Sequence, residues 1–386
     1  LMDTLADEHE RKFNPDDSYQ VQPILKNISK EYAPQKRDIA LMKSNLEEVL
    51  FIFDRIKKLV LEIDKTRTDY PILHSTLDQG IEKAHGLIDI LVLLTENQDP
   101  GWVYWMEGKY KKSTKSNDRL VLSLYAIMID VSNILSRNFF EKNNSCILTS
   151  ATLKIQNSFD YFLNRVGLND IGYVKTREYL SPFYYNDQVS YYQYGGSKEI
   201  SNNPEMLGEV IYNIHRKYNK RMMVLFTSTN TLSQTAKVIN RKSDRKDLPL
   251  FAQVRGASRP SIIRGMHQHP NGILFGTNSF WEGVDLPGDL LEILIMVKLP
   301  FDVPSDPLVQ SYSDHINKQG GNSFIDYNIP ETIIRFRQGF GRLIRTSYDS
   351  GKFICLDNRI VLKRYGSMIS ESLPVEMNTF SNIDSV

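Results

Sequence analysis

The stretch that decides the fold is Gln338-Gly339-Phe340-Gly341-Arg342-Leu343-Ile344-Arg345. If this stretch forms a helix, Gln338, Arg342 and Arg345 stand at positions i, i+4 and i+7, so one amide and two guanidinium groups share a face. Arginine stays charged at every working pH, and its planar fork matches phosphate oxygens. The spacing therefore predicts a cationic face for a nucleoside triphosphate or a phosphodiester. The alternative is a pair of surface arginines on an amphipathic helix.

Three upstream segments have the pattern of a buried strand that runs into a polar loop. They are residues 145–153 (Ser-Cys-Ile-Leu-Thr-Ser-Ala-Thr-Leu), 224–230 (Val-Leu-Phe-Thr-Ser-Thr-Asn) and 273–288, which ends in Trp-Glu-Gly-Val-Asp-Leu-Pro-Gly. In open α/β sheets, ligands bind at the carboxyl ends of the strands, where such loops emerge. The order of these segments predicts a ligand site that residues 338–345 complete.

Together these segments resemble motifs III, IV, V and VI of superfamily 2 helicases, and in detail the DinG/XPD branch. The resemblance rests on residues 149–153 (Thr-Ser-Ala-Thr-Leu), 281–288 and 338–345. It implies an ATP-dependent motor that moves single-stranded DNA in DNA repair or replication. It also leaves open a nucleotide-gated regulatory module of a DinG-type 3'-5' exonuclease, or a module that only binds.

The resemblance implies nucleotide-binding roles for several residues. Arg345 is implied to be the arginine finger on the γ-phosphate of ATP with Mg²⁺, with Arg342 beside it and Gln338 as a polar partner. Such a finger contributes about 10³ to 10⁵ in rate. The further nucleotide-binding residues that it implies are Glu282, Asp285 and Gly341.

The resemblance also implies contacts with single-stranded DNA. Short hydroxyl side chains at strand ends donate to the DNA backbone, which positions a strand without reading its sequence. The residues implied are Thr227, Ser228 and Thr277. Ser150 and Thr152 of motif III are implied to couple the state of the nucleotide to the grip on DNA. Asp357 and Arg359, which follow the last predicted strand, are interpreted as a structural salt bridge.

Two motifs of the family have no counterpart in this sequence. No Gly-x-x-x-x-Gly-Lys-Ser/Thr loop occurs that could hold the β- and γ-phosphates, and no Asp-Glu-Ala-His box occurs that could bind Mg²⁺. The family carries both in its first RecA-like motor domain. We therefore expect this chain to be the carboxyl-terminal part of a larger protein, with that domain as its partner, and to be inactive as an ATPase alone.

The two cysteines, Cys146 and Cys355, stand in apolar segments, and we expect both to be reduced and buried in strands. Some relatives carry an iron–sulfur cluster bound by four cysteines in the first motor domain. Two cysteines are too few for such a cluster, and His267 and His269 lack ligands at metal spacing, so we expect neither cluster nor metal site here.

Net charge is +1, so any binding of nucleic acid must depend on local clusters. Residues 102–115 interleave aromatic side chains with lysines, which is the pattern of single-strand binding. The candidate DNA-binding residues there are Trp105, Lys109, Lys111 and Lys112. The alternative is an amphipathic strand followed by a solvated basic turn.

The sequence predicts three regions. Apolar residues at spacings of three and four predict a helix hairpin over about residues 35–96, within a helical arch-like domain of residues 1–140; a simple spacer is the alternative. Residues 141–168 hold the motif III strand and a link. Residues 169–386 alternate strands and helices, which predicts an α/β fold with a mostly parallel sheet, here a RecA-like second motor domain of the P-loop NTPase type.

Composition is that of a globular protein, with 41% hydrophobic and 24% charged residues. No apolar run approaches the roughly 20 residues that cross a bilayer, and the first residues do not resemble a signal peptide. We therefore expect a cytoplasmic protein without a membrane partner.

Overall fold

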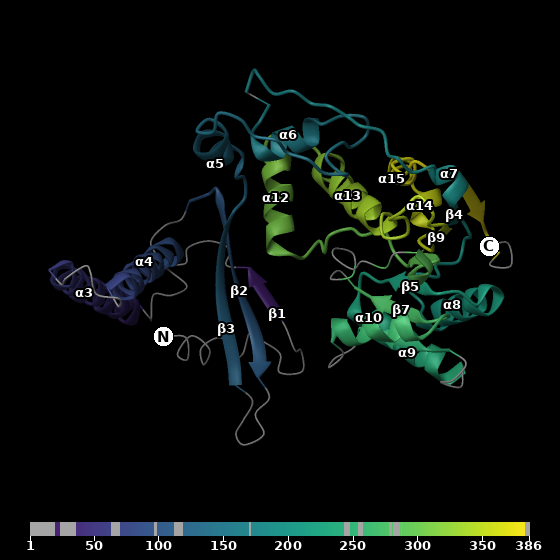
Figure 1. Ribbon diagram of the computed structural model, residues 1–386, viewed down its shortest axis with the longest axis horizontal. Helices are drawn as coiled ribbons and strands as arrows, with labels where there is room; N and C mark the ends of the chain where they lie inside the picture. The colour runs from purple at the N-terminus through teal and green to yellow at the C-terminus, as the bar shows by residue number, and fades with distance from the viewer. Residues whose placement is uncertain are drawn as a thin grey trace. The chain divides into compact units, whose positions relative to one another are not determined.

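The computed structural model forms two compact units, which are described separately (Figure 1). The first comprises Leu1–Asp130 with Pro304–His315, and the second comprises Val131–Val303 with Ile316–Val386. The residues that the structure describes are 20–23, 36–62, 70–95, 99–111, 119–169, 171–242, 248–253, 258–277, 280, 286 and 288–382.

The first unit contains a helix hairpin at the predicted place. Helix α3 (Lys36–Leu61) packs on helix α4 (Tyr70–Thr95), and Lys57 Nζ lies 2.7 Å from Asp78 Oδ1 across their interface. Leu50 and Val60 of α3 are buried against α4. Val49, the residue before Leu50, is 39% exposed and lies off this buried face.

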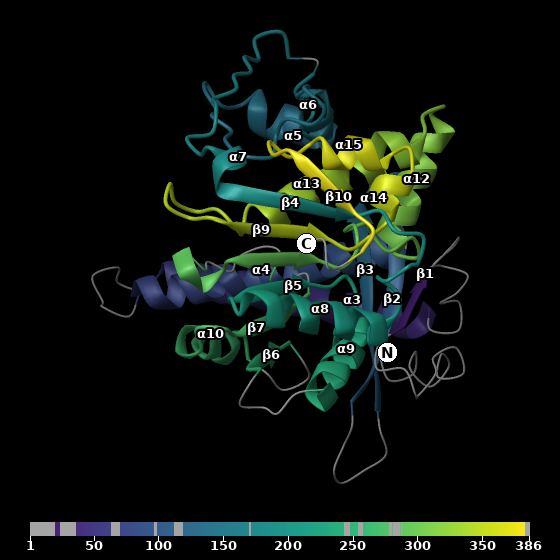
Figure 2. The ribbon, with the colours of Figure 1, turned by 90° about the vertical axis from the view of Figure 1, so that its right-hand side faces the viewer.

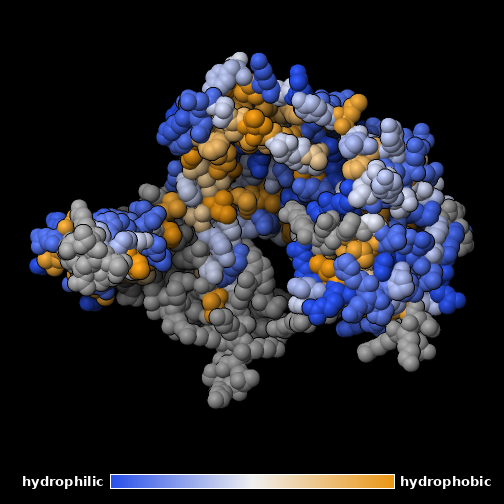
Figure 3. All heavy atoms as spheres, viewed as in Figure 1, coloured by the Kyte–Doolittle hydropathy of each residue, from blue (hydrophilic) through white to orange (hydrophobic). Residues whose placement is uncertain are grey.

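Part of the apolar surface of this hairpin faces outward. Phe51 and Leu59 of α3 are 62% and 63% exposed, and Ile72 of α4 is 71% exposed. Figure 3 shows such hydrophobic patches among the hydrophilic surface of the hairpin. Exposed large side chains at these positions do not stabilise the packing of α3 on α4.

The first unit also contains a sheet, which the expectation of a helical arch-like domain did not include. Its strands are antiparallel in the order β1-β2-β3, with bounds β1 (Gln20–Pro23), β2 (Trp102–Lys111) and β3 (Arg119–Met128). Strand β2 opens with Trp-Val-Tyr-Trp-Met, a run of aromatic and apolar residues of the kind that is enriched in strands.

The second unit is built on a seven-stranded parallel sheet, which confirms the predicted α/β fold. The strand order is β10-β4-β9-β8-β5-β7-β6, and all of the described pairings are parallel. The bounds are β4 (Val189–Tyr194), β5 (Met222–Leu225), β6 (Leu250–Ala252), β7 (Ile273–Gly276), β8 (Ile293–Met296), β9 (Gly351–Cys355) and β10 (Met377–Phe380). The sequence predicted β5 to β9 and missed the two edge-side strands β4 and β10.

Helices cover both faces of this sheet (Figure 2). Helices α8 (Pro204–Tyr218) and α9 (Thr229–Lys242) contribute to the hydrophobic core on one face. Helices α10 (Arg259–Gln268) and α13 (Ile329–Phe340) contribute to the core on the other. The remaining helices are α5 (Ser132–Leu135), α6 (Asp160–Val166), α7 (Tyr185–Gln188), α12 (Pro307–Lys318), α14 (Arg359–Leu362) and α15 (Gly366–Ser370). Burial on both faces explains why the central strands are continuous apolar runs.

The motif III segment does not form the predicted strand. Residues 145–150 have no regular structure, Ile147 is 90% exposed and Cys146 is exposed, so the expected burial of Cys146 is wrong. A strand needs a neighbour for its backbone N–H and C=O groups, and none of the described strands pairs with this segment. Cys355, in contrast, is buried in β9 as predicted, and burial raises the pKa of its thiol.

His215 gives the second unit a testable dependence on pH. This side chain of α8 is 2% exposed, its Nε2 lies 2.8 Å from the carbonyl oxygen of Asn271, and burial lowers its pKa below the ordinary 6.5. Below pH 6.5 the unfolded chain binds more protons at His215 than the folded chain does. The contribution of neutral His215 to the free energy of unfolding is therefore complete above pH 6.5 and is lost as the pH falls.

We therefore expect the free energy of unfolding to fall by up to about 1.4 kcal/mol per pH unit below the unfolded pKa of His215. His215→Gln keeps a donor for the Asn271 carbonyl but does not titrate, so this variant should lose that part of the slope. Urea titrations at several pH values between about 5 and 7.5 measure both proteins across this window. Equal slopes in the two proteins would contradict the assignment.

Candidate functional site

Polar side chains follow neighbouring parallel strands at their carboxyl ends, as predicted. Thr227 and Ser228 come after β5, and Thr277 comes after β7, which pairs with β5. Ser228 also caps the start of α9, because its Oγ accepts a hydrogen bond from the backbone N–H of Thr231 at 3.3 Å. The edge of the sheet thus brings three hydroxyl groups onto one side, which is where ligands bind in open α/β sheets.

Gln253 holds Thr277 in place, and sequence reasoning missed it. Gln253 follows β6, and its Oε1 accepts hydrogen bonds from the backbone N–H and the hydroxyl of Thr277, both at 2.9 Å. The single hydroxyl proton of Thr277 is therefore donated to Gln253, which contradicts its predicted donation to DNA. The available signal for Gln253 was its polar side chain directly after the apolar run Leu250–Ala252.

The cationic run 338–345 does not form one helix, so the predicted helical face is wrong. Helix α13 ends at Phe340, and Arg342 N–H bonds to the Gly339 carbonyl at 3.1 Å in a tight turn. Leu343 and Ile344 are 1% and 3% exposed, so their burial draws the chain back into the core. Gln338 lies in the last turn of α13, Gly341 caps it, and the two arginines follow outside it.

Because α13 ends at Phe340, Arg342 and Arg345 differ in their exposure to solvent. Arg342 is half-buried in the turn, and Arg345 is exposed beyond the buried pair Leu343 and Ile344. Both arginines therefore flank Leu343 and Ile344, whose side chains are buried in the core. An arginine on such a support is suited to an anion that approaches from outside this unit.

Arg337 joins motif III to helix α13, and sequence reasoning also missed it. Its Nη1 donates to the Lys154 carbonyl at 2.5 Å and its Nη2 donates to the Ala151 carbonyl at 2.8 Å. Burial lowers the pKa of Arg337. Ser150 and Thr152 flank this contact, with their hydroxyl oxygens 3.3 Å apart. The two predicted coupling residues are thus tied to the helix that leads to the arginines.

Asp349 supports the turn that carries Arg345. This carboxyl is 6% exposed and accepts hydrogen bonds from the backbone N–H groups of Arg345 at 2.7 Å and Thr346 at 2.9 Å. Burial acts to raise the pKa of Asp349. Hydrogen bonds from the Thr346 hydroxyl and from the backbone of Arg345, Thr346 and Gly288 outweigh burial and hold this pKa below its ordinary value.

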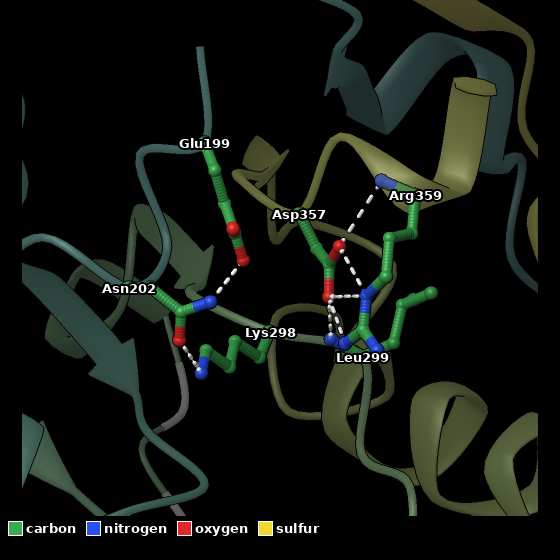
Figure 4. A network of polar contacts seen from close by, with 6 residues as sticks. All are labelled: Glu199, Asn202, Lys298, Leu299, Asp357 and Arg359. Atoms are coloured by element: carbon green, nitrogen blue, oxygen red, sulfur yellow. Dashed lines mark hydrogen bonds and ion pairs between the residues drawn. The ribbon is translucent and has the colours of Figure 1, made fainter. Parts of the chain in front are cut away.

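Asp357 and Arg359 form the predicted structural salt bridge (Figure 4). Arg359 Nη2 lies 2.6 Å from Asp357 Oδ2, and the Leu299 backbone N–H donates to the same carboxylate at 2.9 Å. Asp357 is 1% exposed, so it fastens the end of β9 to the residues after β8. Beside it, Asn202 hydrogen-bonds to Glu199 and Lys298. The buried Asp357 makes this network a packing feature.

The remaining predicted site residues divide into two groups. Trp105 is 8% exposed, and its ring stacks on Tyr125 of β3 with centroids 4.9 Å apart, which contradicts a base-stacking role. The indole N–H donates to Glu107 Oε1 at 3.1 Å. The predicted residues whose side chains lie outside the described part of the chain are Lys109, Lys111, Lys112, Glu282 and Asp285.

Two further properties concern the part of the chain that the structure describes. It contains no group of three or more His, Cys, Asp or Glu side chains placed to hold a metal ion. None of its helices is both long enough and apolar enough to cross a bilayer.

Several known proteins are similar in sequence to this chain. The family described as helicase C-terminal domain matches residues 211–376. The 3'-5' exonuclease DinG of Bacillus subtilis is 34% identical over 259 residues, which cover 66% of this chain and 28% of that protein. The ATP-dependent DNA helicase YoaA of Haemophilus influenzae is 32% identical over 307 residues, which cover 79% of this chain and 45% of that protein. The chain thus spans less than half the length of either relative.

Two solved structures share the architecture. The structure named XPD_APO aligns with a TM-score of 0.52 at 16% identity, covering 82% of this chain and 63% of that chain. The structure of S. tokodaii Xpd4 aligns with a TM-score of 0.51 at 16% identity, covering 98% of this chain and 64% of that chain. At this identity the likeness concerns the fold alone, and it agrees with the RecA-like α/β sheet.

Proposed function

Because this chain belongs to the DinG-like branch of the XPD helicase family and carries its C-terminal helicase domain, we propose that it supplies the second motor domain of an ATP-dependent DNA helicase. The observation that carries the proposal is the turn after α13. It exposes Arg345 while Asp349, 6% exposed, holds the backbone of that turn.

We propose that ATP binds between this domain and the first RecA-like motor domain of the same protein. Arg345 contacts the γ-phosphate, where charge spreads over the equatorial oxygens in the transition state. Arg342 contacts the same triphosphate, and Gln338 is a polar partner at the end of α13. The residues proposed to complete the nucleotide site are Gly341, Glu282 and Asp285.

The proposed DNA contact is the carboxyl edge of the sheet. There, Thr227 and Ser228 contact the backbone of single-stranded DNA. Thr277 is held at the same edge by Gln253, which accepts hydrogen bonds from its backbone N–H and its hydroxyl. In the first unit, Lys109, Lys111 and Lys112 are proposed as a separate contact with DNA phosphates. Arg337 transmits a shift of motif III, which carries Ser150 and Thr152, to the helix before the arginines.

We propose the corresponding division of the chain into an arch-like domain of residues 1–140, a motif III link of residues 141–168 and a RecA-like domain of residues 169–386. The compact units support a boundary close to the first of these, since the first unit reaches Asp130 and resumes only at Pro304.

Residues 1–386 alone are expected to show no DNA-stimulated ATP hydrolysis, because arginines supply charge but no glycine-rich loop and lysine hold the triphosphate. The full-length protein, with a first motor domain, is expected to hydrolyse ATP and to respond to single-stranded DNA. Phosphate release with and without an oligonucleotide measures both preparations. Turnover by residues 1–386 alone would overturn the proposed division of labour.

The 34% sequence identity to the 3'-5' exonuclease DinG of Bacillus subtilis favours a second candidate function. In this second function, the chain is a nucleotide-gated module of an exonuclease. Labelled DNA distinguishes the two. A motor separates the strands of a partial duplex when ATP is added. A regulatory module leaves the duplex paired, and added ATP then changes the rate at which the 3' end is shortened.

A further inference from the structure

We propose that Asp349 is the positioning residue of the arginine turn: it fixes the backbone of Arg345, and ATP turnover depends on it through Arg345. This inference rests on the proposed function. It assigns a role to a residue outside the eight-residue run in which the arginines stand.

Every side of the Asp349 carboxylate is engaged by the turn. Oδ2 accepts from the backbone N–H groups of Arg345 at 2.7 Å and Thr346 at 2.9 Å, and Oδ1 accepts from the Thr346 hydroxyl at 2.6 Å. Three charge-assisted hydrogen bonds from two consecutive residues leave the backbone of Arg345 little freedom. A carboxylate with so many donors is a poor proton acceptor, so its role is geometric.

The turn depends on this anchor because its own side chains contribute little packing. Arg345, Thr346, Ser347 and Tyr348 are all exposed, and Tyr348 is 95% exposed, whereas Asp349 is 6% exposed. Within the turn, the Tyr348 N–H donates to Thr346 Oγ1 at 3.3 Å, a long hydrogen bond. An exposed turn with so little packing of its own samples many conformations unless it is anchored elsewhere. Asp349 is the buried residue that ends it.

A second residue holds the same turn from the carbonyl side. The Gln188 side-chain nitrogen, at the end of α7, lies 2.8 Å from the Asp349 carbonyl oxygen, 3.2 Å from that of Thr346 and 3.3 Å from that of Ser347. Asp349 thus binds the N–H groups of the turn while Gln188 binds its C=O groups.

Such a support affects turnover more than binding. Stabilisation of transition-state charge requires a donor that is already in place, and a displacement of about 1 Å can cost about 10²-fold in rate. Ground-state affinity for ATP comes mainly from elements of the first motor domain. Loss of Asp349 should therefore reduce kcat and change KM for ATP little.

The test is DNA-stimulated ATP turnover by the full-length protein carrying Asp349→Ala, Asp349→Asn or the control Asp187→Ala, an exposed carboxylate beside Gln188. Asp349→Ala is expected to lower kcat by about 10- to 100-fold with a change in KM for ATP of less than about twofold. Asn keeps an acceptor for the two N–H groups and can donate to the Thr346 hydroxyl oxygen, so Asp349→Asn should restore kcat to within about threefold of the parent. The control should match the parent.

A double-mutant cycle separates positioning from a general structural role. If Asp349 acts through Arg345, Asp349→Ala should add no further loss of kcat to Arg345→Ala. Losses that multiply in the double variant would overturn the inference, as would an unchanged kcat in Asp349→Ala. If Arg345→Ala itself keeps full turnover, the proposed arginine finger fails and the inference falls with it.

Thr346→Val covers the case in which Asp349→Ala does not fold. It removes the 2.6 Å hydrogen bond to Oδ1 and the long 3.3 Å hydrogen bond from the Tyr348 N–H, and it leaves the carboxylate in place. The expected loss of kcat is about threefold to tenfold with KM for ATP unchanged. A parental kcat in this variant, with Asp349→Ala unfolded, would overturn the inference.

Discussion

Arg345→Ala in the full-length protein is expected to lower DNA-stimulated ATP turnover by about 10³-fold or more, because the guanidinium is proposed to stabilise charge that develops on the γ-phosphate. The side chain is exposed, so the free energy of unfolding should change by less than about 0.5 kcal/mol. Phosphate release at saturating ATP measures turnover, and urea unfolding measures stability.

Two further variants sharpen this experiment. Arg345→Lys keeps the charge but loses the planar fork, so its turnover should lie between that of the parent and that of Arg345→Ala. Arg364→Ala removes an exposed arginine of the same unit, after α14, and should leave turnover unchanged. Parental turnover in a folded Arg345→Ala protein would show that Arg345 is not the finger.

Asp357→Ala is expected to destabilise the second unit by about 3 kcal/mol, because it leaves the buried Leu299 N–H without its acceptor and Arg359 without its partner. Asp357 is 1% exposed, so water does not replace the lost carboxylate easily. Asp357→Asn keeps an acceptor for the Leu299 N–H but loses the charge, and we expect a smaller cost of about 1–2 kcal/mol.

Urea unfolding of residues 1–386 measures these differences. Glu371→Ala is the matched control, because Glu371 is an exposed acid of the same unit and its loss should cost less than about 0.5 kcal/mol. If Asp357→Ala lowered the free energy of unfolding no more than this control does, the network of Figure 4 would not hold β8 and β9 together.

The motifs identified the family, but they predicted only part of the candidate site. Thr227, Ser228 and Thr277 lie at strand ends as expected, since a strand followed by a polar loop is visible in a continuous segment of sequence. Gln253 and Arg337 were missed. Arg337 bonds to Ala151, which is 186 residues away, and no local pattern reports such a contact.

Trp105 shows why composition alone was misleading. An aromatic residue among lysines is equally typical of a base-stacking surface and of a cross-strand pair. The register of β2 against β3 sets Trp105 opposite Tyr125 and so decides for the pair. Tyr125 lies about twenty residues further along the chain, so the sequence around Trp105 does not contain its cross-strand partner.

The sequence by itself determined the helix hairpin, the central parallel strands and the identity of the motifs. Each depends on a periodicity or a spacing within one segment, and hydrophobic burial follows such local patterns directly. Only the tertiary structure decided that α13 ends at Phe340, that Arg345 extends from a turn held by Asp349, and that residues 145–150 form no strand. These features depend on burial of Leu343 and Ile344 and on hydrogen bonds between distant segments, which exist only once the chain has packed.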